Sequence, residues 1–132
     1  MTPNRRVAAA ALACVGAPFR LHGRDPGHGL DCVGVAAWAL RAGGWDGLVP
    51  TGYALRGGDE RRTAMALGAA LCRGSGTDMG AVLLVRAGPG QLHLAVKVAD
   101  GVVHADAALR RVVMRPGPLP WPLIGAWTVD PA

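Results

Sequence analysis

The sequence predicts an α+β domain in which N-terminal helices pack on an antiparallel sheet of about five strands. Two observations lead to this fold class. Alanine-rich segments with helix caps fill the first half of the chain, whereas short apolar segments separated by turn residues fill the second half. A chain of 132 residues is long enough for one hydrophobic core, so residues 1–132 are predicted to form a single domain.

Three segments carry the signals of helices: residues 4–15, 32–40 and 60–71. Each begins at or directly after a residue that caps helix N-termini well, namely Asn4, Asp31 and Asp59. In the third helix the apolar side chains are expected to face the core: Met65, Leu67 and Leu71. The glycine-rich residues between the first two helices are predicted to form a loop.

Five segments read as strands: residues 81–85, 92–98, 102–105, 111–114 and 124–129. The dipeptide Asp100-Gly101 predicts a two-residue hairpin turn between the second and third of them. Residues 116–122 form a proline-rich connection before the last strand. Trp121 in this connection is interpreted as a structural anchor, with the lining of a cleft as the alternative.

The composition narrows the classes of function. The net charge of +5 comes from scattered arginines without a nucleic-acid-binding motif, so no nucleic acid partner is expected, while a polyanionic cell wall suits the charge.

The three cysteines form no close pair, which argues against a disulfide framework and against structural zinc. No apolar run approaches the ~20 residues of a membrane span. A weak signal-like segment ending at Cys14 is better explained as the first helix.

Cys32 follows the cap residue Asp31 and therefore stands in the first turn of the second helix. The helix dipole and the free backbone N–H groups at such a position favour the thiolate, which makes a cysteine nucleophilic. The alternative is a buried cysteine that packs as a small hydrophobic residue. Cys14 and Cys72 are interpreted as packed helix thiols of this second kind.

Two histidines stand on the strands that flank the predicted hairpin turn, His93 before it and His104 after it. A thiol nucleophile needs a base within hydrogen-bond reach, and the base needs a third group that orients it. Cys32, His93 and His104 could fill these roles in that order, with Asp106 as an alternative third group. A metal site built from the same three residues is a further alternative.

A longer series of short motifs occurs in order between about Val7 and Val129: Gly16–Arg20, Gly23-Arg24, Asp31–Gly34, Gly80–Leu84, His93–Val96 and Val103–Ala105. With these motifs the chain resembles the NlpC-type cysteine peptidases. They are papain-like enzymes that cut bacterial cell-wall peptides, and the likeness is to the short versions found in phages and prophages.

The resemblance implies a function for the site. Cys32 would be the nucleophile, His93 the base and His104 the orienting residue, in hydrolysis of the amide next to D-glutamate in peptidoglycan stem peptides. It implies no metal and no organic cofactor. The partners would be peptidoglycan peptides and phage tail or particle proteins. The protein would stay in the bacterial cytoplasm until lysis or a virion delivers it to the cell wall in the periplasm.

Two positions depart from the family's pattern. Phe19 stands where a tyrosine is common, and Val33 stands where a serine is common after the cysteine. With Asp31, these positions are expected to bind the amino end of the substrate. A site that loses two hydroxyls should accept a different or less polar peptide end. The alternative function is a catalytically weak or inactive tail-tip or wall-binding module with the same fold.

The predicted turn also raises a geometric difficulty. With Asp100-Gly101 as the turn, Lys97 faces His104, and His93 lies four residues further along its strand. At ~3.3 Å per residue this separates the two histidines by about 13 Å, too far for a hydrogen bond. A four-residue loop, a β-bulge or strong local twist would have to close the gap.

Overall fold

The computed structural model describes residues 1–47 and 59–131, and it confirms the α+β fold class. Three helices and a six-stranded antiparallel sheet make up these residues, together with a ladder of two very short strands. The elements in chain order are α1 (Pro3–Ala13), β1 (Arg24–Asp25), β2 (Gly29–Leu30), α2 (Cys32–Ala42), α3 (Glu60–Gly68), β3 (Cys72–Gly74), β4 (Val82–Gly88), β5 (Gln91–Val98), β6 (Gly101–Asp106), β7 (Arg111–Pro116) and β8 (Leu123–Thr128).

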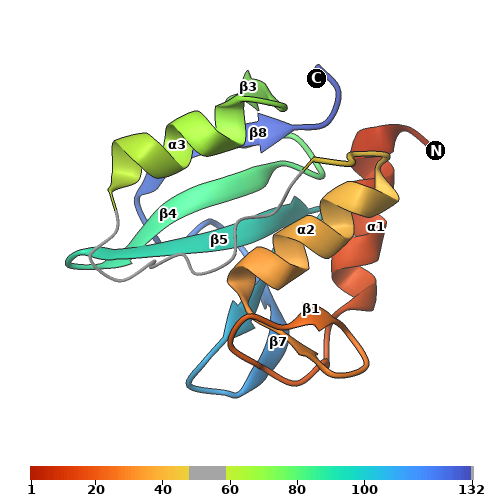
Figure 1. Cartoon of the computed structure of the whole chain (residues 1–132), viewed down its shortest axis with the longest axis vertical. Coiled ribbons are helices and arrows are strands. Elements are labelled where there is room, and N and C mark those ends of the chain that lie inside the picture. Colours follow the sequence, from red (N-terminus) through yellow and green to blue (C-terminus); the bar gives the residue numbers. More distant parts are fainter. Residues whose placement is uncertain (48–58, 132) are drawn as a thin grey trace.

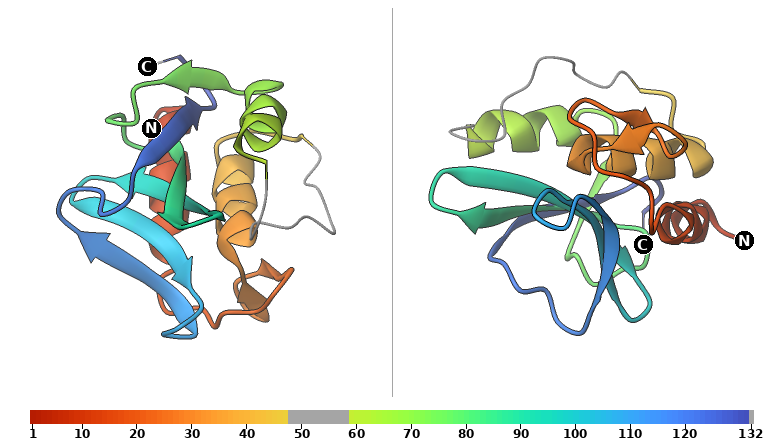
Figure 2. Two further views of the ribbon diagram at one scale, coloured as in Figure 1. Left: turned by 90° about the vertical axis from the view of Figure 1, so that its left-hand side faces the viewer. Right: turned by 90° about the horizontal axis from the view of Figure 1, so that it is seen from below.

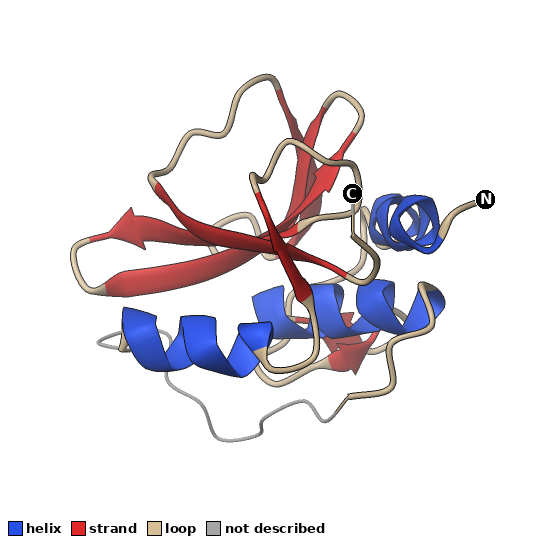
Figure 3. Ribbon diagram, turned by 90° about the horizontal axis from the view of Figure 1, so that it is seen from above, coloured by secondary structure: helices blue, strands red, loops and turns tan. Residues whose placement is uncertain are grey.

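The sheet has the strand order β3-β8-β4-β5-β6-β7, with every neighbouring pair antiparallel. Helices α2 and α3 lie along one face of it (Figures 1 and 3). Helix α1 lies beside α2 and also contacts β5 (Figure 2). The N-terminal helices therefore form one layer and the sheet the other, as the sequence predicts.

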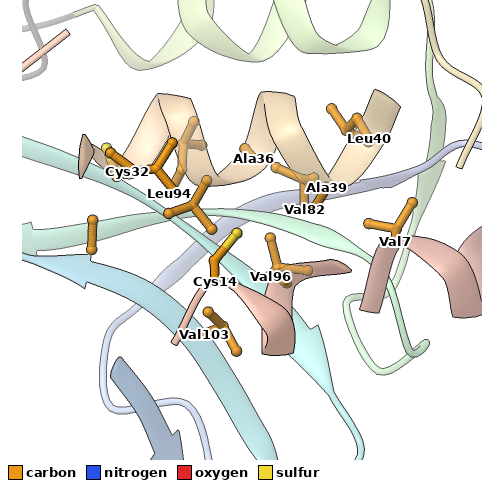
Figure 4. Packing of buried hydrophobic residues seen from close by; sticks show 14 of the residues in the cluster. Val7, Cys14, Cys32, Ala36, Ala39, Leu40, Val82, Leu94, Val96 and Val103 are labelled. Atoms are coloured by element: carbon orange, nitrogen blue, oxygen red, sulfur yellow. The ribbon is translucent and has the colours of Figure 1, made fainter. Parts of the chain in front are cut away.

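Buried side chains form two clusters, one on each face of the sheet. The larger cluster fills the space between the helices and the sheet and includes Val7, Leu40, Val82 and Val96 (Figure 4). The smaller cluster lies on the opposite face, where Leu119 and Trp121 of the β7–β8 connection pack against it. Because both faces are covered, the first four residues of β4 are all buried, which explains their uninterrupted apolar sequence.

Helix α1 begins two residues earlier than the prediction based on Asn4. Thr2 is the N-cap, with its hydroxyl accepting a hydrogen bond from the Arg5 N–H, and Pro3 takes the first helical position. The Asn4 side chain exchanges hydrogen bonds of 3.0 and 3.1 Å with the backbone of Asp130. Its polar groups are therefore used for a contact between the two ends of the described chain.

Helix α3 ends at Gly68, three residues before the predicted end at Leu71. The chain then turns into strand β3, in which Cys72 pairs with Thr128 of β8, so Cys72 is a half-buried strand residue and not a helix thiol. Leu71 is buried as expected, but the prediction for Met65 is wrong, because its side chain is 68% exposed. The sheet consequently gains a sixth strand that the sequence did not predict.

The β5–β6 turn differs from the prediction by one position. Val98 pairs with Gly101, so the turn residues are Ala99 and Asp100, and Gly101 is the first residue of β6. A Cβ atom on Gly101 would overlap the backbone carbonyl of Arg115 on the neighbouring strand. Glycine is therefore required here for close strand contact and not for the turn.

Residues 17–29 are mainly loop, as predicted, with the short β1–β2 ladder inside them. None of the helices in residues 1–47 and 59–131 combines the length and the hydropathy needed to cross a membrane.

Candidate active site

A cleft of about 1160 Å³ lies where the start of α2, the β4–β5 turn, the start of β5 and the end of β6 meet. Five of the six predicted site residues line it: Phe19, Asp31, Cys32, His93 and His104. The sixth, Val33, does not line the cleft and packs partly buried against the larger core cluster. The structure thus gathers the predicted catalytic residues from three separate elements.

Cys32 is the first residue of α2, as predicted, and Asp31 is the N-cap whose carboxylate accepts from the Gly34 N–H at 2.8 Å. A Cβ atom on Gly34 would overlap the carbonyl of Gly23, so this glycine lets the preceding loop lie directly on the helix start. The side chain of Cys32 lies near Leu94 of β5 (Figure 4) and is only 5% exposed. Local sequence and close packing together fix the position of the thiol.

His93 and His104 form a hydrogen bond of 3.0 Å between His93 Nε2 and His104 Nδ1. The predicted separation of about 13 Å is therefore wrong. Because Lys97 pairs with Val102 and not with His104, continuing the same register sets His104 opposite Ala95, two residues from His93. The shifted turn therefore reduces the predicted offset between the two histidines from four residues to two.

The thiol and the imidazole approach the cleft from different faces of the sheet. Leu92 and Leu94 belong to the cluster beneath the helices, so His93 between them points to the other face. The ladder of paired residues between β5 and β6 ends at Val96–Val103, although both strands continue past this pair. The two strands are therefore not paired next to His93 and His104. In the described residues no hydrogen bond joins Cys32 to His93. Such contacts are often long before substrate binds.

Burial, with a smaller contribution from the negative charge of Asp31, raises the pKa of the Cys32 thiol to about 12. The backbone groups of Leu94, Val33 and Cys32 act in the opposite direction. The lowering expected at a helix start is therefore present, but burial outweighs it. The prediction of a resting thiolate is wrong, and the site holds a neutral thiol.

Burial and, to a smaller extent, the neighbouring His104 lower the pKa of His93 to about 4, against an opposing effect of Asp106. Burial also lowers the pKa of His104, which Asp106 raises. At neutral pH both imidazoles are uncharged. In the tautomer in which His93 Nε2–H donates to His104 Nδ1, the lone pair of His93 Nδ1 is available to accept a proton.

The lowered pKa of His93 predicts a stability that falls in mild acid. Between pH 6.5 and about 4 the unfolded chain binds a proton at this residue and the folded chain does not, so the free energy of unfolding decreases as the pH falls. The full decrease is about 3 kcal/mol by pH 4. Urea denaturation at a series of pH values measures it.

The control for this experiment is His93→Gln, which removes the titrating group at similar size. Its free energy of unfolding should depend less steeply on pH over the same interval. If the free energy of unfolding changed equally steeply with pH in both proteins, the pH dependence would not come from His93. At the alkaline end, the raised pKa of Cys32 predicts that stability falls as the pH rises above 9, and Cys32→Ala should lose this dependence.

Asp31 is not available as a bare negative charge. Its Oδ1 accepts from Arg24 at 3.0 Å in an ion pair, in addition to the Gly34 N–H, and its Oδ2 accepts from the His22 N–H at 2.8 Å. The Asp31 residue as a whole is 4% exposed. Sequence reasoning did not identify this role of Arg24, because seven residues separate it from Asp31 without a regular element between them.

Sequence reasoning also missed several residues of the cleft and gave one of them, Trp121, only as an alternative. The apolar side chains of Leu21 and Leu92 and the β4–β5 turn from Ala87 to Gln91 line it, and Trp121 contacts both histidines. The proline-rich sequence around Trp121 was the only signal, and it allowed the alternative that this residue lines a cleft. The structure confirms that alternative.

The remaining thiols and acids lie outside the proposed roles. Cys14 is buried in the core, and burial raises its pKa. Asp106 lines the cleft, but its Oδ1 accepts from the Ala108 and Leu109 N–H groups in the turn that follows β6. Among residues 1–47 and 59–131, no three His, Cys, Asp or Glu side chains gather in a way that could hold a metal ion.

The chain has an α+β domain in which a helix that begins with a cysteine packs on an antiparallel sheet that carries two paired histidines. Solved NlpC/P60 domains have the fold of this chain. NlpC1 from Trichomonas vaginalis has a TM-score of 0.71 at 18% identity, over 96% of this chain and 45% of that chain. The NlpC/p60 domain of the peptidoglycan hydrolase SagA has a TM-score of 0.58 at 24% identity, over 86% and 88%.

A third solved structure is a Staphylococcus aureus protein described as similar to lipoprotein, of the NLP/P60 family. Its TM-score is 0.64 at 19% identity, over 98% of this chain and 42% of that chain. The chain thus spans less than half of the Trichomonas and Staphylococcus structures and most of the SagA domain. No protein-family model and no curated protein match the sequence.

Proposed function

We propose that this protein is a cysteine peptidase that hydrolyses amide bonds in bacterial peptidoglycan stem peptides, next to D-glutamate. The observation that carries the proposal is the 3.0 Å His93–His104 hydrogen bond in the same cleft as Cys32. The fold shared with the SagA domain supports cell wall as the substrate. The phage or prophage origin, and delivery by lysis or by a particle, belong to the proposal through the sequence resemblance.

In the proposed reaction the substrate carbonyl carbon lies above the Cys32 sulfur. His93 Nδ1 takes the thiol proton as the sulfur attacks, and His104 holds the His93 ring through Nε2. The Cys32 N–H belongs to the first turn of α2, where N–H groups have no partner within the helix, and it can donate to the oxyanion. His93 then returns the proton to the leaving amine, and water hydrolyses the thioester.

The pKa values define the kind of proton transfer. With the thiol near 12 and the imidazole near 4, the resting pair is neutral, in contrast to the thiolate–imidazolium pair of a strongly activated cysteine. His93 therefore acts as a general base during the attack, as in a serine hydrolase. Displacement of water by substrate would strengthen the contact between the two groups.

The charge arrangement at Asp31 bears on the substrate. Arg24 offsets the negative charge of the Asp31 carboxylate, whose oxygens also accept hydrogen bonds from the N–H groups of His22 and Gly34. Phe19 in the lining adds no positive or negative charge. A free ammonium group would find no unpaired partner at this carboxylate. We therefore propose that the peptide end held next to Asp31 is an amide and not a free amine.

The test uses intact peptidoglycan and two synthetic stem peptides, one with a free and one with an acetylated amino end. Mass spectrometry of the products should locate the new ends at the D-glutamate amide, and the acetylated peptide should be cut about tenfold faster or more. Arg24→Gln removes the charge that offsets Asp31 and should reduce or reverse this preference. Cleavage of the free peptide alone would contradict the role assigned to Arg24.

A second candidate function is a wall-binding module with little or no activity. The buried, protonated Cys32 without a hydrogen bond to His93 in the described residues favours it. The same experiment separates the two functions. Binding to intact peptidoglycan without new peptide ends would support the module, and new ends that disappear after thiol alkylation would support the peptidase.

A further inference from the structure

We propose that Trp121 is a positioning residue. Its ring holds the His93–His104 pair in the hydrogen-bonded orientation and forms the wall that keeps water away from the two imidazoles. The inference rests on the proposed function only in treating His93 as the base and His104 as the residue that orients it. Neither the sequence motifs nor the proposed catalytic residues include Trp121, which lies in the irregular connection between β7 and β8.

Three rings meet edge to face at this point. The ring centroids of His93 and His104 lie 5.1 Å apart at 89°, those of His93 and Trp121 5.4 Å apart at 78°, and those of His104 and Trp121 4.9 Å apart at 83°. Each distance lies in the favourable range for edge-to-face aromatic contacts. Because each ring abuts the other two, neither imidazole can rotate without losing a contact with Trp121.

The connection is built to hold the indole ring in place. Trp121 stands between Pro120 and Pro122, which restrict its backbone, and the Pro122 carbonyl accepts from the Arg86 N–H of β4 at 3.0 Å. The Arg115 guanidinium lies 5.9 Å from the ring centroid, in a cation–π position. The ring is therefore fixed by β4 and β7 and not by the histidines alone.

Trp121 is half-buried and lines the cleft together with both histidines. Part of the indole therefore stays accessible to a substrate, while its edge packs on the imidazoles. Since burial is the main cause of the lowered pKa of His93 and of His104, loss of the indole would admit water and raise both pKa values toward 6.5.

The experiment compares Trp121→Ala and Trp121→Phe by NMR titration of the imidazole carbons and nitrogens. In the wild type, His93 should titrate near 4 and stay in the tautomer with the proton on Nε2. In Trp121→Ala the pKa of His93 should rise by about one unit or more, with a mixture of tautomers. Trp121→Phe keeps a ring edge and should stay close to the wild type. Trp38→Ala, at a tryptophan that does not line the cleft, should cause no shift.

Activity supplies the second readout. The kcat of Trp121→Ala should fall about tenfold or more, with the acid limb of the pH profile moved upward like the NMR pKa. If the alanine variant does not fold, Trp121→Leu keeps apolar volume without a ring edge and should show the same mixture of tautomers. A folded Trp121→Ala or Trp121→Leu with unchanged titration and unchanged tautomer overturns the inference. Absence of turnover in the wild type would refute the proposed function, while the titration still decides the role of Trp121.

Discussion

Cys32→Ala is expected to abolish hydrolysis of peptidoglycan peptides, with a loss of at least about 10³-fold in turnover, because the variant lacks the thiol that would form the thioester in this cleft. The variant should still fold. Removal of one sulfur atom from a buried site costs about 1 kcal/mol, and the Asp31 cap and the Gly34 contact stay in place. Turnover is measured by the release of new amino ends, and folding by circular dichroism.

The matched control is Cys72→Ala. Cys72 is a half-buried thiol on β3 that does not line the cleft, so its loss should leave turnover unchanged. Full activity in Cys32→Ala would refute the cysteine peptidase mechanism. Loss of activity in both variants would indicate damage to the fold and would be visible in the circular dichroism spectrum.

His93→Ala is expected to lower kcat by about 10²–10⁴-fold, because the Cys32 thiol is protonated at neutral pH and depends on a base during the attack. In a site with a resting thiolate the same substitution would matter less for the attacking step. The acid limb of the pH profile should also change, since the wild-type limb near pH 4 reports the protonation of His93.

His104→Ala tests the orienting role separately. It leaves the base in place but removes the partner of His93 Nε2, so the loss in kcat should be smaller than for His93→Ala. The exposed His28 offers a control of the same residue type, with its side chain 79% accessible and outside the cleft lining. A larger loss for His104→Ala than for His93→Ala would indicate that His104 is the base and His93 the orienting residue.

Features that depend on neighbouring residues were predicted well from the sequence. The Cys32 helix follows from Asp31, whose carboxylate caps the helix through a local contact with Gly34. The hairpin that carries His93 and His104 follows from two apolar segments on either side of the turn dipeptide Asp100-Gly101. These elements were predictable because their causes lie within a few positions along the chain.

Features that depend on distant contacts were predicted incorrectly. The hairpin register depends on the contact between Gly101 and the Arg115 carbonyl, which no turn rule contains. The state of the Cys32 thiol depends on its burial between α2 and the sheet, which outweighs the local effect of the helix start. The end of α3 depends on the pairing of β3 with β8. In each case a tertiary contact decides between two locally reasonable alternatives.

The role of Gly101 has a consequence for protein engineering. Side chains at Ala99 and Asp100 can be exchanged without changing which residues of β5 and β6 face each other. An inserted residue would instead turn His104 toward the helices, because a shift of one position reverses every side chain of a strand. Libraries that alter the specificity of this cleft should therefore vary the composition of this turn while keeping its length.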